Sequence, residues 1–526
     1  MRTRRQDGFT LIELLVVIVI LGVLSAIVVF SIRGIGDKGR GAAVAADAAT
    51  LRTAEESYCA KHGHYGSIDE LKGDGLLVGE PVYNMVAVGE ENKCGKGEKS
   101  SYTLYDTSPT ERTADSIAVG QGPADLAVDE KTNRVYVASS VGNSVTVIDG
   151  KTDKPIGAPI DVSGAVSVPT RIAVNSGTGQ VYVGGTGGVA IIDTANGNQV
   201  IDVAGYTTTV NGLAVSPENG DVYVGGGKDG ASAVAYIPAG SASATPIPLP
   251  APGLVSDTLG MDFSFDPARH AVYFAKTNFG TGTSDDASIG VFAVSSQTHE
   301  ARIVWKFPTR ASCGATNAGN LLVNNSARGT IAVDPNRNLV YLLARRCVPD
   351  PQKPTGTWKN VATAIAINPA DSSSKEMDDP VGQTNAPHMG AVYSPAGGSV
   401  YVFSNNGTNT ECGGSPGRIL QIVGTAITRQ AAVCGASMNG NPAHKVTVLR
   451  KSNRVFVAQL VTKDGTTGAI LAPGGLGVAD GTTMLTQGAL GKPSHFGSLA
   501  VNNTTGKVYA VDLTTNTLAV FGAGSV

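Results

Sequence analysis

The stretch that decides the fold is residues 123–152, PADLAVDEKTNRVYVASSVGNSVTVIDGKT. Apolar and polar residues alternate on both sides of Asn/Gly turns, which is typical of antiparallel β-hairpins. The unit recurs along the chain, and each copy has an aromatic residue in its second strand. These residues are Tyr136, Tyr182, Tyr223, Tyr273, Tyr341, Tyr401, Phe456 and Tyr509. Their spacings of 41 to 68 residues suit four-stranded blades, so we predict a β-propeller.

The copies predict eight blades, with seven as the alternative if the weak sixth or seventh copy forms no blade of its own. The repeats are similar to the YVTN type, and this resemblance covers residues 115–526. The last copy ends on the third strand of a blade, at residues 517–521, so its outer strand is expected upstream. We expect residues 114–120 to fill that place and to close the ring, because closure removes an exposed sheet edge.

A second signal lies at the N-terminus, where the basic leader MRTRRQD precedes the apolar run GFTLIELLVVIVILGVLSAIVVFSI, residues 8–32. Glu13 is the one charged residue of this run. A helix of 23 residues from Thr10 to Ile32 is long enough to span a bilayer. The leader arginines predict a cytoplasmic N-terminus, with the remainder of the chain outside.

The order Gly8, Phe9, Glu13 in this setting resembles the processing signal of the type IV prepilin and pseudopilin family. The resemblance implies that a prepilin peptidase cuts between Gly8 and Phe9 and that Phe9 is N-methylated. In an assembled filament, Glu13 could pair with the α-amino group of a neighbouring Phe9, so that neither charge stays alone among apolar helices. A plain single-pass anchor is the alternative.

The predicted fold is mainly β, with a long N-terminal helix, a small pilin-like α+β head and the propeller. Helical periodicity continues to about Lys61, and YNMVAV and SSYTLYD are expected to be two strands of the head. The expected divisions are a leader (1–8), a transmembrane and assembly segment (9–32), a pilin-like helix and head (33–108), a linker (109–114) and the propeller (115–526).

Six cysteines behind an export-type N-terminus predict disulfides in an oxidising compartment. A bridge from Cys59 to Cys94 would join the end of the helix to the head. Of the fifteen connectivities that six cysteines allow, we prefer the one with one further bridge inside each of two propeller blades, and free buried thiols are the alternative. These pairs are Cys313 with Cys347 and Cys412 with Cys434.

Candidate catalytic and metal-binding groups are sparse. The first strands of three successive blades are preceded or opened by His388, His444 and His495, which would approach the mouth of the central channel, although caps at strand ends are the ordinary interpretation. Asp285 and Asp286 offer loop oxygens of the kind that calcium binds, without an EF-hand pattern. We predict no metal and no cofactor.

Two further motifs have ordinary explanations. His62 and His64 have no further metal ligand nearby in the sequence, so a solvated helix end is the simpler interpretation. The glycine string 184–188 joins two strands with no helix after it, which indicates a turn rather than a phosphate loop. Repeated Asp residues near strand ends are expected to form turns; they include Asp129, Asp149, Asp193 and Asp334.

The sequence predicts a pilin-like filament subunit, minor or at the tip, which displays an extracellular propeller for adhesion or ligand binding. Expected partners are the prepilin peptidase, other pilin subunits, the inner membrane before assembly and an unknown extracellular ligand. A net charge of −3 speaks against nucleic acid. One alternative is a cargo-binding pseudopilin of a type II-like secretion system, and another is a surface-tethered hydrolase or lactonase, although we expect no enzyme.

Overall fold

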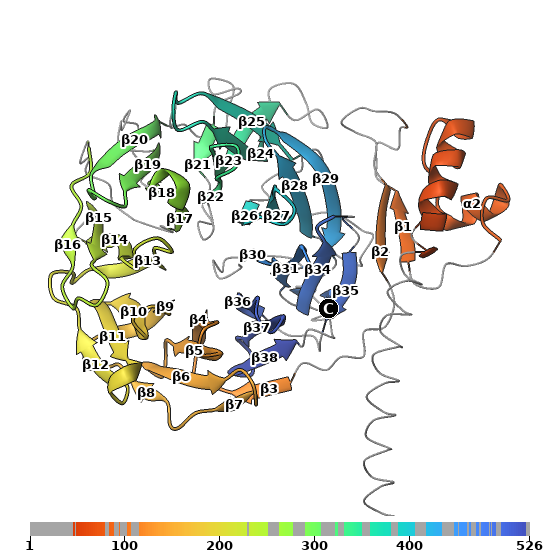
Figure 1. The fold of residues 1–526 in the computed structure, drawn as a ribbon. Helices are drawn as coiled ribbons and strands as arrows, with labels where there is room; N and C mark the ends of the chain where they lie inside the picture. The colour runs from red at the N-terminus through yellow and green to blue at the C-terminus, as the bar shows by residue number, and fades with distance from the viewer. Residues whose placement is uncertain are drawn as a thin grey trace, which may run out of the picture.

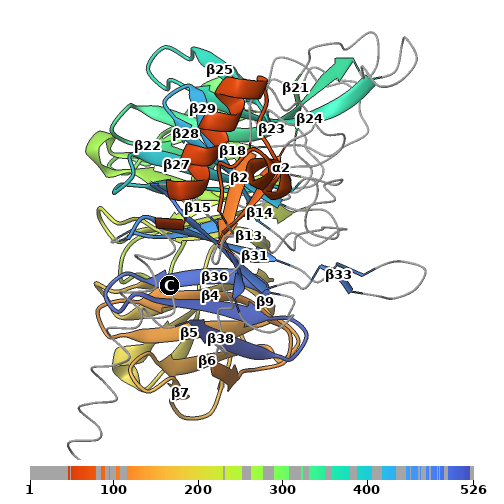
Figure 2. The ribbon, with the colours of Figure 1, turned by 90° about the vertical axis from the view of Figure 1, so that its right-hand side faces the viewer.

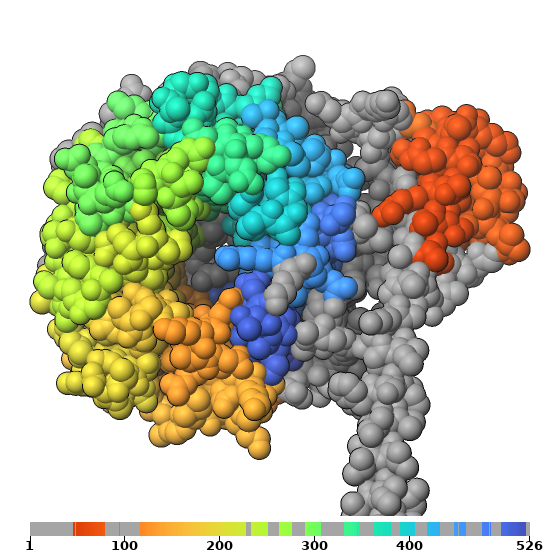
Figure 3. Space-filling model, viewed as in Figure 1, coloured from red at the N-terminus to blue at the C-terminus, as the bar shows by residue number. Residues whose placement is uncertain are grey.

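The computed structural model describes residues 46–78, 84–88, 94, 102–106, 115–250, 262–276, 290–306, 321–323, 331–349, 358–379, 388–405, 417–433 and 446–521, except 48, 229–230 and several short gaps in the last range. The fold is mainly β, as predicted. Eight blades surround a central axis, and a small head lies beside the ring (Figure 1). The space-filling view shows the blades packed side by side around a central hollow (Figure 3).

The strands of each blade are called A to D from the axis outward. Blade 1 has β4 (Pro123–Asp129), β5 (Arg134–Ser139), β6 (Ser144–Asp149), β7 (Lys154–Pro155) and β8 (Ile160–Asp161). Blade 2 has β9 (Ser167–Asn175), β10 (Gln180–Thr186), β11 (Gly188–Asp193) and β12 (Gln199–Asp202). Blade 3 has β13 (Thr209–Val215), β14 (Val222–Lys228), β15 (Ala231–Ile237) and β16 (Thr245–Pro246). Blade 4 has β17 (Phe263–Asp266), β18 (Ala271–Lys276), β19 (Gly290–Ser295) and β20 (Ala301–Lys306).

The second half of the ring carries the additions to the basic blade. Blade 5 has β22 (Ile331–Asp334), β23 (Leu339–Pro349), β24 (Trp358–Ile367) and β25 (Ser374–Asp378), with β21 (Leu321–Val323) beside β23. Blade 6 has β26 (His388–Ser394), β27 (Ser399–Asn405), β28 (Gly417–Val423) and β29 (Ala426–Val433). Blade 7 has β30 (Val446–Leu449), β31 (Arg454–Gln459), β34 (Gly475–Asp480) and β35 (Thr486–Leu490), and between β31 and β34 come β32 (Thr462–Lys463) and β33 (Ile470–Ala472), which project from one face of the ring (Figure 2).

Blade 8 closes the ring with strands from both ends of the propeller. Its strands are β36 (Phe496–Asn502), β37 (Lys507–Asp512), β38 (Thr517–Phe521) and β3 (Asp115–Ala118). The outer strand β3 pairs antiparallel with β38, and Ile117 lies opposite Leu518. This is the pairing that the strand order predicted for residues 114–120. The seventh copy also forms a blade of its own, so the alternative of seven blades is wrong.

The core of the propeller lies between the blades. B strands such as β5 and β10 are buried on both faces, because each blade packs against a neighbour on either side. The repeated tyrosines occupy these B strands, and the hydroxyl groups of Tyr341 and Tyr401 donate to backbone carbonyls of the next blade. Tyr341 donates to the carbonyl of Gly424 at 2.7 Å, and Tyr401 donates to that of Gly481 at 2.8 Å. At these two positions the aromatic residue joins neighbouring blades by both apolar contact and a hydrogen bond.

Short polar side chains shape the turns, as the sequence predicted. At the end of β22, the Asp334 carboxylate accepts from the backbone N–H groups of Asn336 and Arg337 at 3.0 and 3.2 Å. Asn338 follows in the left-handed region, with φ 54°, where asparagine has a low conformational cost. The turn from A to B (AB turn) and the turn from C to D (CD turn) lie on the same face of each blade, because strand direction alternates.

The head contains a helix at residues 49–62, the short helix α2 (Ile68–Gly73) and a hairpin of β1 (Asn84–Val88) and β2 (Tyr102–Asp106). Both head strands fall where the sequence placed them. A capping box begins α2, since Ser67 and Glu70 each bond the other's backbone N–H. The core of this unit contains Leu51, Ala54, Tyr58, Leu71 and Leu77.

The head is joined to the propeller by a sheet. Strand β2 pairs in parallel with β35, with Tyr105 opposite Thr486 and Asp106 opposite Gln487. Blade 7 is thereby extended into a six-stranded sheet in the order β1-β2-β35-β34-β31-β30 (Figure 1). Only a linker was predicted between the two parts, so this contact at the rim of the ring is an addition to the prediction.

Candidate functional site

The predicted processing and assembly residues precede the described part of the chain. Gly8, Phe9 and Glu13, together with the apolar run 8–32, lie outside it, so their roles stay predictions. Among the described residues, no helix combines the length and the apolar character needed to cross a membrane. The candidate sites that the structure describes therefore lie in the head and in the ring.

The disulfide predicted for the head is present. Cys59, near the end of the helix 49–62, is bonded to Cys94, and their Cα atoms are 5.7 Å apart. The backbone N–H of Cys94 also donates to the carbonyl of Gly63 at 3.2 Å. Because Cys94 lies between β1 and β2 in sequence, the bridge fastens the helix end to the hairpin that contacts blade 7.

Glu55 is a site residue that the sequence analysis missed. Its side chain is completely buried in the head. One carboxylate oxygen, Oε2, accepts from the backbone N–H of Gly66 at 3.0 Å, and Oε1 has no partner among the described residues. Burial raises the pKa of Glu55 to about 7, since desolvation outweighs the hydrogen bond from Gly66. The head therefore contains an acid that titrates near neutral pH.

His62 and His64 make contacts within the head. The His62 Nε2 atom lies 2.6 Å from Oδ2 of Asp74, and its ring stacks on Tyr58 with centroids 4.2 Å apart. His64 Nδ1 is 3.0 Å from the carbonyl oxygen of Tyr65. Within the described ranges, no group of three or more His, Cys, Asp or Glu side chains is arranged to hold a metal ion.

Several predicted loop residues lie outside the described ranges. They are Asp285, Asp286, Cys313, Cys412, Cys434, His444 and His495. Cys347 is in β23, opposite Asn360, and His388 begins β26, opposite Ser404. The two propeller disulfides, the calcium site and the convergence of histidines at the channel therefore stay predictions.

The glycine string 184–188 is a turn between β10 and β11, as predicted. A Cβ atom at Gly184 would lie 2.5 Å from the Val210 side chain, and one at Gly188 would lie 2.6 Å from the Tyr206 carbonyl oxygen. The string is thus explained by close packing of blade 2 on blade 3, because glycine allows the backbones to approach.

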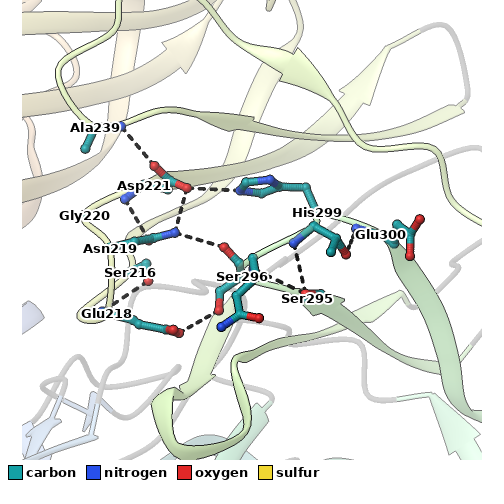
Figure 4. A network of polar contacts seen from close by, with 12 residues as sticks. Ser216, Glu218, Asn219, Gly220, Asp221, Ala239, Ser295, Ser296, His299 and Glu300 are labelled. Carbon is teal, nitrogen blue, oxygen red and sulfur yellow. Dashed lines mark hydrogen bonds and ion pairs between the residues drawn. The ribbon is translucent and has the colours of Figure 1, made fainter.

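A network of polar contacts joins the AB turn of blade 3 to the CD turn of blade 4 (Figure 4). His299 Nε2 is 3.0 Å from Asp221 Oδ2, and the imidazole stacks on Tyr236, with centroids 3.5 Å apart and planes at 5°. Asn219 donates to Asp221 at 2.8 Å and to the carbonyl of Ser296 at 3.0 Å. Two neighbouring blades thus share one hydrogen-bonded cluster.

A second histidine joins this cluster through Glu218. The Ser296 hydroxyl donates to Glu218 Oε2 at 2.6 Å, and His270 Nδ1 contacts Oε1 of the same carboxylate. The Ser296 hydroxyl, and less strongly the His270 ring, hold the pKa of Glu218 below its ordinary value. The Ser296 hydroxyl donates its hydrogen bond to a carboxylate and not to an imidazole, so this is not the arrangement of a catalytic triad. The cluster connects blades and has no nucleophile poised for reaction.

The sequence contained a signal for this cluster that the motif search missed. In the AB turns, the left-handed position holds Asn or Gly in every blade but the fourth. The residues are Asn133, Gly179, Gly220, His270, Asn338, Gly398, Asn453 and Gly506. An alignment of the repeats on this position would have marked His270 as the exception.

Comparison with known proteins finds separate similarities for the N-terminal segment and for the ring. Residues 3–29 match the model of the prokaryotic N-terminal methylation motif. The N-terminus carries this methylation motif. The chain is 37% identical over 82 residues to the type II secretion system core protein G of Aeromonas hydrophila, which covers 16% of this chain and 56% of that protein. The chain spans about half the length of the curated relatives it matches.

The ring has the fold of other propellers. The Dos1 propeller superposes with a TM-score of 0.50 and 11% identity, over 78% of this chain and 94% of that one. An ancestral GH74 enzyme, AFV00434, gives a TM-score of 0.43 and 14% identity, over 77% of this chain and 54% of that one. A fold by itself decides neither catalysis nor binding, because function depends on the site that the fold carries.

Proposed function

We propose that the protein is a pilin-like filament subunit, minor or at the tip, which displays its propeller outside the cell for adhesion or ligand binding. The observation that carries the proposal is the presence, in one chain, of the methylation motif and a closed eight-bladed ring. The N-terminal segment would serve processing by the prepilin peptidase and assembly with other pilin subunits. The ring would serve recognition.

The width of the ring supports a minor or tip position. Neighbouring strands lie about 4.8 Å apart, so a blade of four strands is about 15 Å wide and two opposite blades span about 40 Å with the axis between them. Helices in a packed bundle are only about 8 to 10 Å apart. Adjacent subunits at that spacing have no room to carry one ring each against the shaft.

The first experiment labels purified filaments with an antibody raised against the propeller. We expect sparse or terminal label, and label along the whole length would contradict a minor or tip role. The second experiment replaces Glu13 with alanine and uses Ser25→Ala as a control within the same apolar run. Cleavage before Phe9 should continue in both variants, whereas filament entry should fall only in Glu13→Ala. Equal entry of the two variants would refute the pairing role of Glu13.

A second candidate is a pseudopilin that grips exported cargo, and the likeness to type II secretion core protein G favours it. Deletion of the protein separates the two functions. Loss of attachment with normal secretion supports an adhesin, and loss of secreted proteins from the medium supports the pseudopilin. A hydrolase would instead show turnover on a panel of lactones and glycans, which we expect to be absent.

A further inference from the structure

The left-handed positions of the turns provide an internal comparison between blades. In the CD turns these positions hold Asp153, Asn198, Gly240, His299, Ser372, Gly424 and Met484. Blade 4 is the one described blade with an imidazole at both of its left-handed turn positions, with φ 51° at His270 and φ 58° at His299. Most other blades fill these positions with residues that do not titrate near neutral pH.

Both imidazoles face acids of the same neighbouring turn. His270 meets Glu218, and His299 meets Asp221, so the AB turn of blade 3 supplies both carboxylates. The His299 pair is the more shielded, with side chains 18% and 13% exposed, against 48% and 23% for the His270 pair. Shielded pairs are screened less by salt, so the His299 pair contributes more of the electrostatic attraction between blades 3 and 4.

We propose that this contact is a pH-responsive latch, which holds blade 4 more tightly on blade 3 when His270 and His299 take up protons. An imidazole ordinarily titrates near pH 6.5. Protonation turns both contacts with the carboxylates into ion pairs, in which donor and acceptor carry opposite charges. It also places a cation against the face of Tyr236, which adds a cation–π attraction to the stack.

The groups around the imidazoles favour this response. Burial raises the pKa of Tyr223, and Asp221 and Glu218 raise it further, so its ring beside His299 stays neutral. Arg269, next to His270, is paired with Asp266 and donates to the carbonyl of Pro335, away from the latch. In the described part of the chain, neither Glu218 nor Asp221 has an ion pair with lysine or arginine. Glu300 follows His299 and adds a further negative charge.

The seam between blades 8 and 1 has a neutral contact at the AB position that His270 occupies in blade 4. Between blades 8 and 1, the Asn502 side chain donates to the Asn133 side chain at 2.8 Å, with Asn133 at the AB position that His270 holds in blade 4. Asparagine tolerates the left-handed backbone there. The substitutions His270→Asn and His299→Asn therefore remove the titrating groups and retain turn residues that other blades already use.

The test is hydrogen exchange of the full-length chain in detergent at pH 5.5 and pH 8, corrected for the intrinsic effect of pH on exchange. In the natural sequence, amides of residues 209–228 and 290–306 should gain several-fold protection at the lower pH, because both contacts then become ion pairs. The double variant should lose this gain, and amides around Asn133 and Asn502 should show none in either protein. An equal gain in the natural protein and the double variant would overturn the proposal.

A second variant tests the proposal even if the double variant does not fold. Asn133→His with Asn502→Asp places a titrating pair between blades 8 and 1. This variant should create a gain in protection at pH 5.5 around those two positions. A response at blades 3 and 4 that persists after Glu218→Gln and Asp221→Asn would show that the imidazole–carboxylate contacts are not its cause.

Discussion

Replacement of the buried acid of the head, Glu55→Gln, should remove a pH dependence from the stability of the helix 49–62. The folded-state pKa of Glu55 is raised from 4.5 to about 7. Below pH 4.5 the carboxyl group is protonated in both the folded and the unfolded chain. The free energy of unfolding is then highest, because no charge has to be buried. Between pH 4.5 and pH 7 the unfolded chain releases the proton first, so stability falls as the pH rises. Above pH 7 the loss is complete.

The difference between these pKa values corresponds to at most about 3 kcal/mol, or roughly a few hundredfold change in the opening equilibrium of the head. Glutamine has the same shape and can still accept from the backbone N–H of Gly66. We therefore expect Glu55→Gln to match the natural protein near pH 4.5 and to open far less at pH 8.

Hydrogen exchange of residues 49–62 in the two proteins at each pH measures this difference, and comparison at one pH cancels the intrinsic rate. The control is Glu56→Gln, which removes the adjacent exposed carboxylate. It should change exchange little at either pH. Equal protection of Glu55→Gln and the natural protein at pH 8 would refute the reasoning, as would a difference of the same size at pH 4.5.

Three further predictions concern the ring and the disulfide. Tyr341→Phe leaves the Gly424 carbonyl without its inter-blade partner and should lower the free energy of unfolding by about 1 to 2 kcal/mol, whereas Tyr223→Phe, whose hydroxyl has no partner among the described residues, should be near neutral in urea denaturation. Ile117→Ala should cost about 2 to 5 kcal/mol and loosen the closure strand, measured as faster proteolysis near residue 115. Cys94→Ser should lower the stability of the head by about 2 to 4 kcal/mol, measured by exchange in residues 49–62.

The number of blades and the closing strand were predictable because their signals repeat. The aromatic residue of the B strand marks each copy, and the last copy shows only the A, B and C strands of a blade, so its outer strand was expected upstream. The head strands were predictable from alternation alone. These features depend on patterns of many residues, so single irregular copies did not hide them.

The rim contact and the blade 3–4 cluster were not predictable in the same way. Parallel pairing of β2 with β35 involves two residues on each strand, and the strands are far apart in sequence. No local pattern encodes so short a contact. His299 and Asp221 come together only because the repeat folds one turn beside the next. A burial such as that of Glu55 depends on packing in three dimensions, since a charged residue on a helix ordinarily indicates an exposed face.

The pairing of β3 with β38 determines when the ring can close during synthesis. It is the first strand of the propeller to leave the ribosome, and its partner β38 is the last. At about 5 to 20 residues per second, the roughly 400 residues between them take on the order of 20 to 80 seconds to synthesise. During that time the ring is open and the partner edge of β3 does not exist. Completion of the fold is thus a late event, and a chain cut short before β38 leaves the first blade and the last without the strand that joins them.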